Sequence, residues 1–113
     1  MATIKSYTDI EQSKKLAEIL PLESADMFYN LGESKLPNVI YGNYDDFKCY
    51  LPCWSLTALL KTLNFPSLTQ NKEDEWEVCV FDHDNDDYIK KTASNPIDVC
   101  YEMIIKLNKL NLL

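Results

Sequence analysis

The sequence contains no arginine: all eleven of its basic residues are lysine, against eighteen acidic residues. Arginine supplies the planar, two-pronged donor that recognises phosphate groups and guanine, so its absence removes the usual means of nucleic-acid recognition. The formal net charge of -7 also opposes binding to nucleic acids and to anionic membrane surfaces. We therefore expect no nucleic-acid partner and no membrane partner.

Long apolar runs are missing as well. Residues 1–15 lack the apolar core of a signal peptide, and no run approaches the roughly 18 apolar residues of a membrane span. These absences favour a cytoplasmic protein, in which four cysteines are most simply four reduced thiols. At 113 residues, 46% of them hydrophobic, we expect a single domain over residues 1–113 that folds without a disulfide or a metal.

The most unusual stretch is residues 48–63, KCYLPCWSLTALLKTL. Its leucines are spaced i, i+3, i+4, i+7, which predicts one apolar face of a short helix; they are Leu56, Leu59, Leu60 and Leu63. Either Ser55 caps this helix or Pro52 opens it, and in both cases Cys53 and Trp54 lie at its entrance. Asn64 and Pro66 end it.

Changes in the spacing of apolar residues predict the other elements. In chain order they are a helix over residues 9–20 with a capping box of Thr8 and Glu11, strands over 24–31 and from 39 to 41, a polar loop over 67–74, strands over 76–81 and 88–93, and a last helix capped by Asn95 and opened by Pro96. Periodicity does not decide whether residues 47–51 are strand or loop. The predicted fold is α+β, of order αββαββα: one antiparallel four-stranded sheet of two hairpins, with three helices mainly on one face.

A possible metal or thiol site involves three cysteines and the only histidine. Cys49 and Cys53 are separated by three residues, as are Cys79 and His83, a spacing that superficially resembles a zinc site. Cys53 at a helix amino terminus is also the best candidate for a lowered thiol pKa, with His83 as the only available base. This small thiol- or metal-dependent enzyme is our alternative hypothesis. We predict no cofactor, no metal and no enzymatic activity, because nothing local brings these ligands together.

An acidic turn follows the clearest strand. Its carboxylates, Asp82, Asp84, Asp86 and Asp87, resemble the start of a calcium loop, but the sixth position is not glycine and the twelfth, Ala93, is not glutamate. A solvated hairpin tip is the simpler interpretation. Residues 73–87 hold eight acids and no lysine, so this surface either meets a basic partner or protects a strand edge from aggregation.

Aromatic residues concentrate just before and within the central stretch. Five fall within fourteen residues: Tyr41, Tyr44, Phe47, Tyr50 and Trp54. Such side chains are typical interface anchors, although they more often pack sheet edges and helix entrances. Our candidate interaction surface consists of these five residues together with Asp84, Asp86 and Asp87. Self-association into a homodimer through an exposed strand edge is a further possibility.

Three segments carry a family resemblance: IEQSKKLAEILPLESADMFY, CYLPCWSLTALL and SNPIDVCYEMIIKLNKL. The chain resembles a family of short, uncharacterised bacterial proteins of unknown function found among prophage and mobile-element genes of gut anaerobes. The similarity spans nearly the whole chain and is weakest over residues 31–46. It implies an α+β fold and a phage or mobile-element setting, and it carries over no catalytic or binding residue. The function we expect is therefore a small cytosolic protein-interaction or accessory module.

Overall fold

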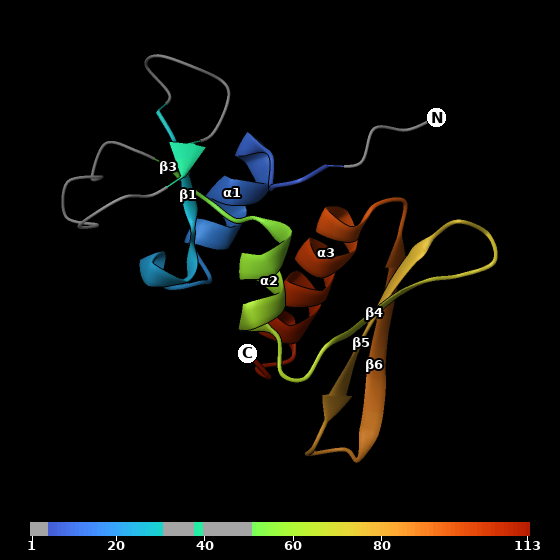
Figure 1. Ribbon diagram of the computed structural model, residues 1–113. Helices are drawn as coiled ribbons and strands as arrows, with labels where there is room; N and C mark the ends of the chain where they lie inside the picture. Colours follow the sequence, from blue (N-terminus) through green and yellow to red (C-terminus); the bar gives the residue numbers. More distant parts are fainter. Residues whose placement is uncertain (1–4, 31–37, 40–50) are drawn as a thin grey trace.

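The computed structural model describes residues 5–30, 38–39 and 51–113, which form three α-helices and two antiparallel sheets (Figure 1). The elements in chain order are α1 (Ile10–Ala17), the 3-10 helix η1 (Leu22–Ser24), β1 (Met27–Tyr29), β2 (Asn38–Val39), β3 (Leu51–Cys53), α2 (Leu56–Thr62), β4 (Ser67–Gln70), β5 (Trp76–Asp82), β6 (Asp87–Ala93) and α3 (Pro96–Lys109). The predicted α+β class is confirmed.

Two three-stranded sheets form instead of the single four-stranded sheet that the sequence predicted. β1 lies between β2 and β3, and β5 lies between β4 and β6, all in antiparallel pairs. The second hydrogen-bonding edge of β1 pairs with β3 and that of β5 pairs with β4, so each predicted hairpin gains a third strand and the two sheets are separate. The prediction of a loop over residues 67–74 was also wrong, because β4 begins there and pairs with β5 from Ser67↔Cys79 to Gln70↔Trp76.

The helices lie between the two sheets and not, as the sequence predicts, mainly on one face of a single sheet (Figure 1). α1 contacts β3, α2 packs on α3, and α3 contacts β5 and β6. Apolar side chains from these elements meet in one core, whose larger members are Leu16, Leu20, Trp54, Leu59, Leu63, Val78, Val80, Ile97, Met103, Ile104 and Leu107. The predicted leucine face of α2 is confirmed, since Leu56 and Leu60 pack against the same core.

The sequence left two ways to begin α2, and the structure uses Ser55. The Ser55 hydroxyl oxygen accepts a hydrogen bond from the backbone N–H of Ala58 at 3.2 Å, which satisfies one of the unpaired donors of the first turn. Pro52 and Cys53 both lie in β3. Cys53 is therefore a strand residue, and the helix begins three residues after it.

α1 and α3 both begin at side-chain caps. In α1 the capping box joins Asp9 to Gln12, one residue later than the predicted pair of Thr8 and Glu11. Thr8 is instead fully buried, and its hydroxyl is engaged by Ser13 and by the backbone N–H of Trp54. α3 begins as predicted: the Asn95 side chain accepts from the backbone of the first turn, and proline occupies the start of the helix. No helix in the described ranges combines the length and the apolar character that crossing a membrane requires.

The β5–β6 hairpin has one face in the core and one face outward. Val78 and Val80 of β5 are buried, and Ile89 and Ala93 of β6 pack against the same core, as predicted. Because side chains alternate along a strand, Phe81 projects to the other face. α3 covers the inner face of this sheet, so the outer face and the far end of the hairpin are where β5 and β6 present side chains.

Candidate functional site

The turn between β5 and β6 is held in shape by Asp82. Its carboxylate accepts hydrogen bonds from the backbone N–H of Asp84 at 3.0 Å and from the side-chain amide of Asn85 at 2.6 Å. The hydrogen bond from the Asn85 side chain, helped by the backbone N–H groups, lowers the pKa of Asp82 despite its burial. Asp86 has φ 52°, a left-handed conformation that aspartate tolerates better than most residues. The turn thus has a defined geometry without glycine.

Three carboxylates project from this ordered turn. Asp84, Asp86 and Asp87 are all exposed. One oxygen of Asp87 accepts a hydrogen bond from the backbone N–H of Tyr88 at 2.7 Å, which ties the turn to the start of β6. These three residues were part of the predicted interaction surface, and the structure describes them as a charged group at one end of a hairpin.

Three rings lie directly beside these carboxylates. Phe81 pairs with Tyr88 across the hairpin, with ring centroids 5.0 Å apart, and the centroids of the Phe81 and His83 rings are 4.8 Å apart. Both contacts are edge-to-face, the favourable arrangement for aromatic pairs. Tyr88 is 61% exposed, so the cluster is accessible from solvent. A cation above such rings is attracted by their negative faces, and neighbouring carboxylates add to that attraction.

A small pocket of about 260 Å³ lies on the inner side of the same hairpin end. Its apolar lining comes from the sheet, the end of α3 and the residues after it: Val80, Phe81, Ile89, Leu107, Leu112 and Leu113. Its polar lining includes His83 and Asp84 from the acidic turn, and Asn64 from the segment after α2. The pocket and the charged turn therefore share residues. We call this end of the hairpin the hairpin site: it comprises the pocket on the inner side, the ring cluster of Phe81, His83 and Tyr88, and the three exposed carboxylates of the turn between them.

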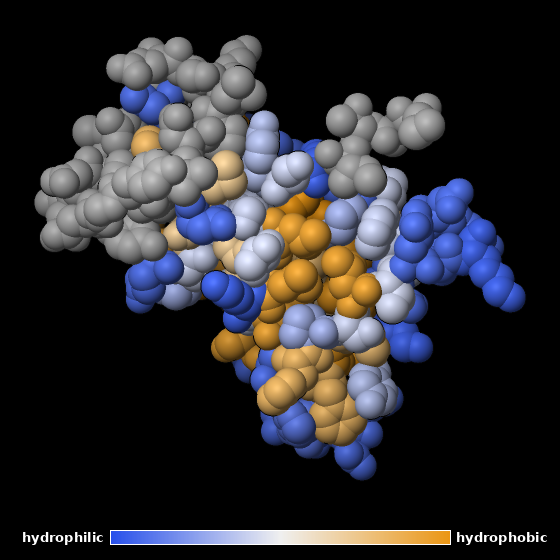
Figure 2. All heavy atoms as spheres, in the orientation of Figure 1, coloured by the Kyte–Doolittle hydropathy of each residue, from blue (hydrophilic) through white to orange (hydrophobic). Residues whose placement is uncertain are grey.

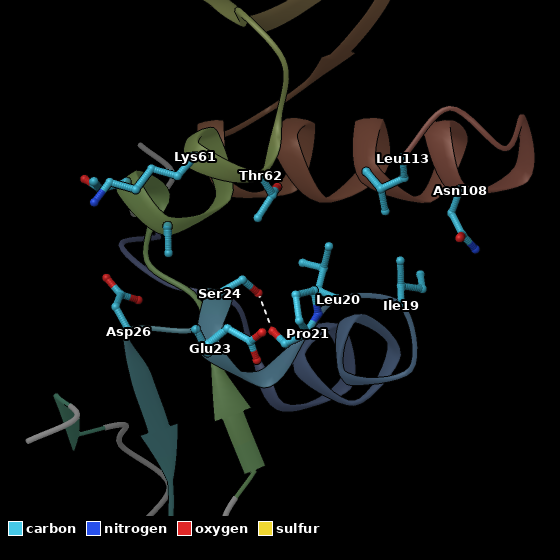
Figure 3. Close-up of a pocket in the computed structure, with 13 residues that line it drawn as sticks. Ile19, Leu20, Pro21, Glu23, Ser24, Asp26, Lys61, Thr62, Asn108 and Leu113 are labelled. Carbon is cyan, nitrogen blue, oxygen red and sulfur yellow. Dashed lines mark hydrogen bonds between the residues drawn. The ribbon is translucent and has the colours of Figure 1, made fainter. Parts of the chain in front are cut away.

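A larger groove of about 860 Å³ lies between the end of α1, η1, α2 and the carboxyl-terminal residues (Figure 3). Leu20, Ile19 and Leu113 lie toward one end of it, whereas Lys61 and Asp26 lie toward the other. The Asp26 carboxylate is already engaged, since it accepts hydrogen bonds from both the backbone and the hydroxyl of Ser55. The groove is spacious, but its mixed charges select no class of ligand.

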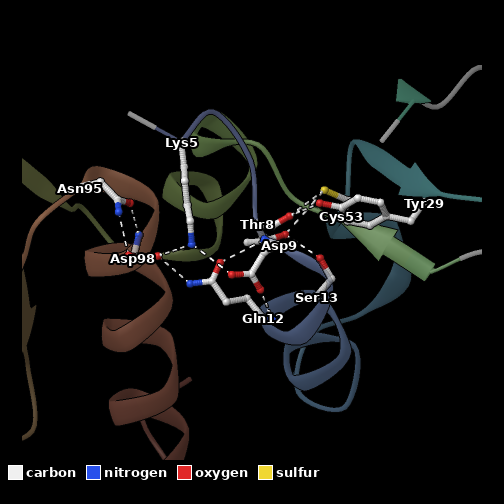
Figure 4. A network of polar contacts seen from close by, with 9 residues as sticks. All are labelled: Lys5, Thr8, Asp9, Gln12, Ser13, Tyr29, Cys53, Asn95 and Asp98. Carbon is white, nitrogen blue, oxygen red and sulfur yellow. Dashed lines mark hydrogen bonds and ion pairs between the residues drawn. The ribbon is translucent and has the colours of Figure 1, made fainter. Parts of the chain in front are cut away.

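The Cys53 thiol belongs to a buried polar network between α1, β1 and β3 (Figure 4). It lies 3.4 Å from the carbonyl oxygen of Thr8, which also accepts a hydrogen bond from the Tyr29 hydroxyl at 2.6 Å. The Thr8 hydroxyl pairs with Ser13 at 2.8 Å and accepts from the backbone N–H of Trp54 at 3.1 Å. These bonds satisfy polar groups that the core encloses, so the network has a structural role.

The prediction of an activated Cys53 was wrong. The Cys53 side chain has no exposed surface, and burial raises its thiol pKa, which favours the unreactive protonated form. The helix dipole that was expected to lower this pKa begins only at Leu56. His83, the expected base, lies exposed beyond β5 in the other sheet. The structure does not bring the two proposed catalytic residues together.

A second part of the network links the amino-terminal segment to α3 (Figure 4). The Lys5 ammonium lies 3.0 Å from the carboxylates of both Asp9 and Asp98. Asp98 also accepts from the side chains of Gln12 and Asn95, each at 2.7 Å. Burial raises the pKa of Asp98, but hydrogen bonds from Gln12, Lys5 and Asn95 outweigh it, so the net pKa is lowered.

The other candidate ligands are dispersed. Cys49 lies outside the described residues, Cys79 is half-buried in β5, and Cys53 is in the other sheet. Within the described ranges no three histidine, cysteine or acidic side chains form a group that could hold a metal ion. In the calcium-like turn, Asp82 turns its carboxylate to the backbone of its own turn.

The aromatic residues of the predicted interaction surface are where the structure and the prediction differ most. Trp54 is fully buried, and its indole N–H donates to the Ser24 hydroxyl at 2.9 Å, so including it in an exposed surface was wrong. The burial follows from its place between β3 and α2, where it joins the core. The other four predicted anchors, Tyr41, Tyr44, Phe47 and Tyr50, lie outside the described residues.

Sequence reasoning missed Phe65, which is 83% exposed in the segment between α2 and β4. Its φ of 49° is left-handed, which is unfavourable for a bulky residue. The sequence Asn-Phe-Pro at residues 64–66 signals the end of a helix, but nothing in it reveals that the ring faces solvent. The pocket beside Asn64 was missed for a similar reason, because segments distant in sequence build it.

Comparisons with protein-family models, with curated proteins and with solved structures found no match to this chain.

Proposed function

We propose that this chain is a small accessory protein that binds a basic segment of a partner protein at the hairpin site. The observation that carries the proposal is the juxtaposition of three exposed carboxylates with an accessible aromatic cluster on an ordered turn. The partner we expect belongs to the phage or mobile-element setting that the family resemblance implies.

Charge distribution supports a basic partner. Residues 82–87, at the end of the hairpin, contain four carboxylates and no lysine, so no cation within the turn neutralises them. Complementary charge accelerates encounter and fixes the register of a complex. Aromatic residues add what charge alone lacks, since Tyr88 and Phe81 offer contact area and cation–π attraction to a lysine or arginine side chain.

Pre-organisation also supports this site. Asp82 holds the turn through hydrogen bonds to the following residues, so the carboxylates need little further ordering when a partner binds. Less conformational entropy is then lost on association. The larger groove has room for a ligand, but it is lined by both a lysine and carboxylates, and the Asp26 carboxylate already accepts a hydrogen bond from Ser55. Its charges therefore favour no one class of ligand.

The test is binding of fluorescently labelled lysine-rich peptides, measured by fluorescence anisotropy. In the test variant Asp84, Asp86 and Asp87 are replaced by asparagine, which keeps their size and removes their charge. Binding should weaken about tenfold, because exposed charge pairs contribute roughly 0.2–1 kcal/mol each. It should also weaken as salt is added, because salt screens exposed charges.

The matched control removes three charges from the other end of the same sheet. Glu73→Gln, Asp74→Asn and Glu75→Gln alter the turn between β4 and β5 and leave the hairpin site intact. The control should bind the peptides almost as tightly as the unmodified protein. Equal losses in both variants would mean that net charge, and no particular site, attracts the peptide; that result, or no peptide binding at all, overturns the proposal.

A further inference from the structure

We infer that the pocket of the hairpin site receives a single apolar side chain of the partner segment, next to the basic residues that the carboxylates attract. The partner class is thus narrowed to a peptide with one apolar anchor flanked by lysine or arginine. This inference rests on the proposed function.

The size and lining of the pocket support one anchor. Its volume of about 260 Å³ exceeds the roughly 150 Å³ of an apolar cavity known to hold benzene, and it falls below the roughly 300–1,000 Å³ of pockets for small molecules. Leu107, Leu112 and Leu113 give it an apolar wall, so an aliphatic or aromatic side chain removes apolar surface from water there.

Exposed apolar surface continues beside the pocket. Asn64 lines the pocket, and Phe65, the next residue, is the most exposed large hydrophobic side chain of the described residues. Its left-handed backbone stores strain, a feature that clusters at functional positions. Figure 2 shows apolar side chains extending over this face toward the lower end of the sheet, with hydrophilic ones around them. An apolar centre with a polar rim is the usual anatomy of a binding surface.

Charge decides between the possible occupants. His83 and Asp84 line the pocket, and Asp86 and Asp87 follow in the same turn, so an incoming segment meets carboxylates at the pocket's edge. A second copy of this chain would bring its own acidic turn to the same place, and like charges there oppose association. A basic segment meets no such repulsion. The surface therefore fits a basic peptide better than self-association.

The experiment uses the full chain and lysine-rich peptides that are identical except at one central position, which is leucine, phenylalanine or alanine. We expect the leucine or phenylalanine peptide to bind about tenfold to a hundredfold more tightly than the alanine peptide, because its anchor is removed from water. Asn64→Trp, which places a bulky ring at the exposed pocket lining, should abolish this preference. Asn64→Ala, which keeps the pocket open, should preserve it.

The outcomes separate this inference from the proposed function. If all three peptides bind equally and binding still depends on the three carboxylates, the anchor pocket is wrong and the proposed function stands. If no peptide binds, the proposed function fails and the inference fails with it. If sedimentation shows a dimer that Asn64→Trp dissociates, the pocket's occupant is a second copy and the peptide inference is overturned. Circular dichroism of each variant verifies that it is folded.

Discussion

Asn85 donates twice to the Asp82 carboxylate, from its side-chain amide at 2.6 Å and from its backbone N–H at 3.4 Å. This relationship makes an acidic turn without glycine into an ordered one. Asp82→Ala removes the acceptor, so we expect faster hydrogen exchange at the backbone amides of Asp84 and Asn85. Exchange measured by NMR tests this, with Asp87→Asn as the control that keeps Asp82. Unchanged exchange at both amides would contradict the role of Asp82.

The Thr8 hydroxyl should contribute more to stability than an exposed threonine. It bonds Ser13 and the backbone N–H of Trp54 inside the core. Thr8→Val keeps the shape but removes the acceptor of the buried Trp54 N–H, and a buried donor without a partner costs about 1–3 kcal/mol. Urea unfolding measures the loss. Thr92→Val, at an exposed position of β6, serves as the matched control and should change the free energy of unfolding by less than about 0.5 kcal/mol.

Thiol reactivity should follow burial. Cys53 and Cys100 are fully buried, and burial raises the pKa of Cys100 to about 12, whereas Cys79 is half-buried. Among these three thiols we expect an alkylating reagent to modify Cys79 first and the other two only after unfolding. Mass spectrometry of digested protein gives the order. If Cys53 of the native protein were modified as fast as Cys79, that result would contradict this expectation and support an activated Cys53 thiol.

Asp98 should contribute to stability in a way that depends on pH. Its folded pKa is lowered, so its contribution is present above the ordinary carboxyl pKa and is lost as pH falls through the lowered value. The free energy of unfolding should therefore decline in acid, and this decline should be smaller in Asp98→Asn. Urea unfolding over a series of pH values provides the test. An identical decline in the variant would show that Asp98 is not responsible.

The protein should be more stable with a smaller polar residue at position 65 than with Phe65. Asparagine adopts left-handed φ more readily, so Phe65→Asn should raise the free energy of unfolding by up to about 1 kcal/mol. The same change should weaken binding of the anchored peptides if the ring contributes to the surface. Thermal unfolding and anisotropy are measured on one sample. A loss of stability would mean that the ring packs in the fold and is not strained for presentation.

The sequence predicted the elements whose signals are local. α3 carries its own cap, its proline and its apolar stripe, and β5 and β6 carry alternating side chains that face one core. β4 lacks such a signal because three of its four residues are exposed, and it exists through pairing with β5. The division into two sheets likewise depends on which strands occupy the edges of β1 and β5, a property of pairing between segments and not of any one segment.

The candidate site was predictable to a similar extent. The exposed carboxylates follow from a charge-rich turn between two strands, and the structure describes them there. The prediction for Trp54 was wrong because an aromatic residue before a helix gives the same sequence pattern whether its side chain is buried or exposed. The exposure of Phe65 and the formation of the pocket depend on how α2, the hairpin and the end of α3 pack together, so no local sequence pattern predicts them.

The most direct test is an NMR titration of isotope-labelled protein with the lysine-rich peptide that carries a leucine anchor. We expect backbone signals to shift at Phe81 to Tyr88, at Asn64 and at Leu112, which surround the hairpin site. Signals of Ser24 and Lys61, in the larger groove, should stay in place. Shifts confined to that groove, with the hairpin signals unchanged, would contradict the account.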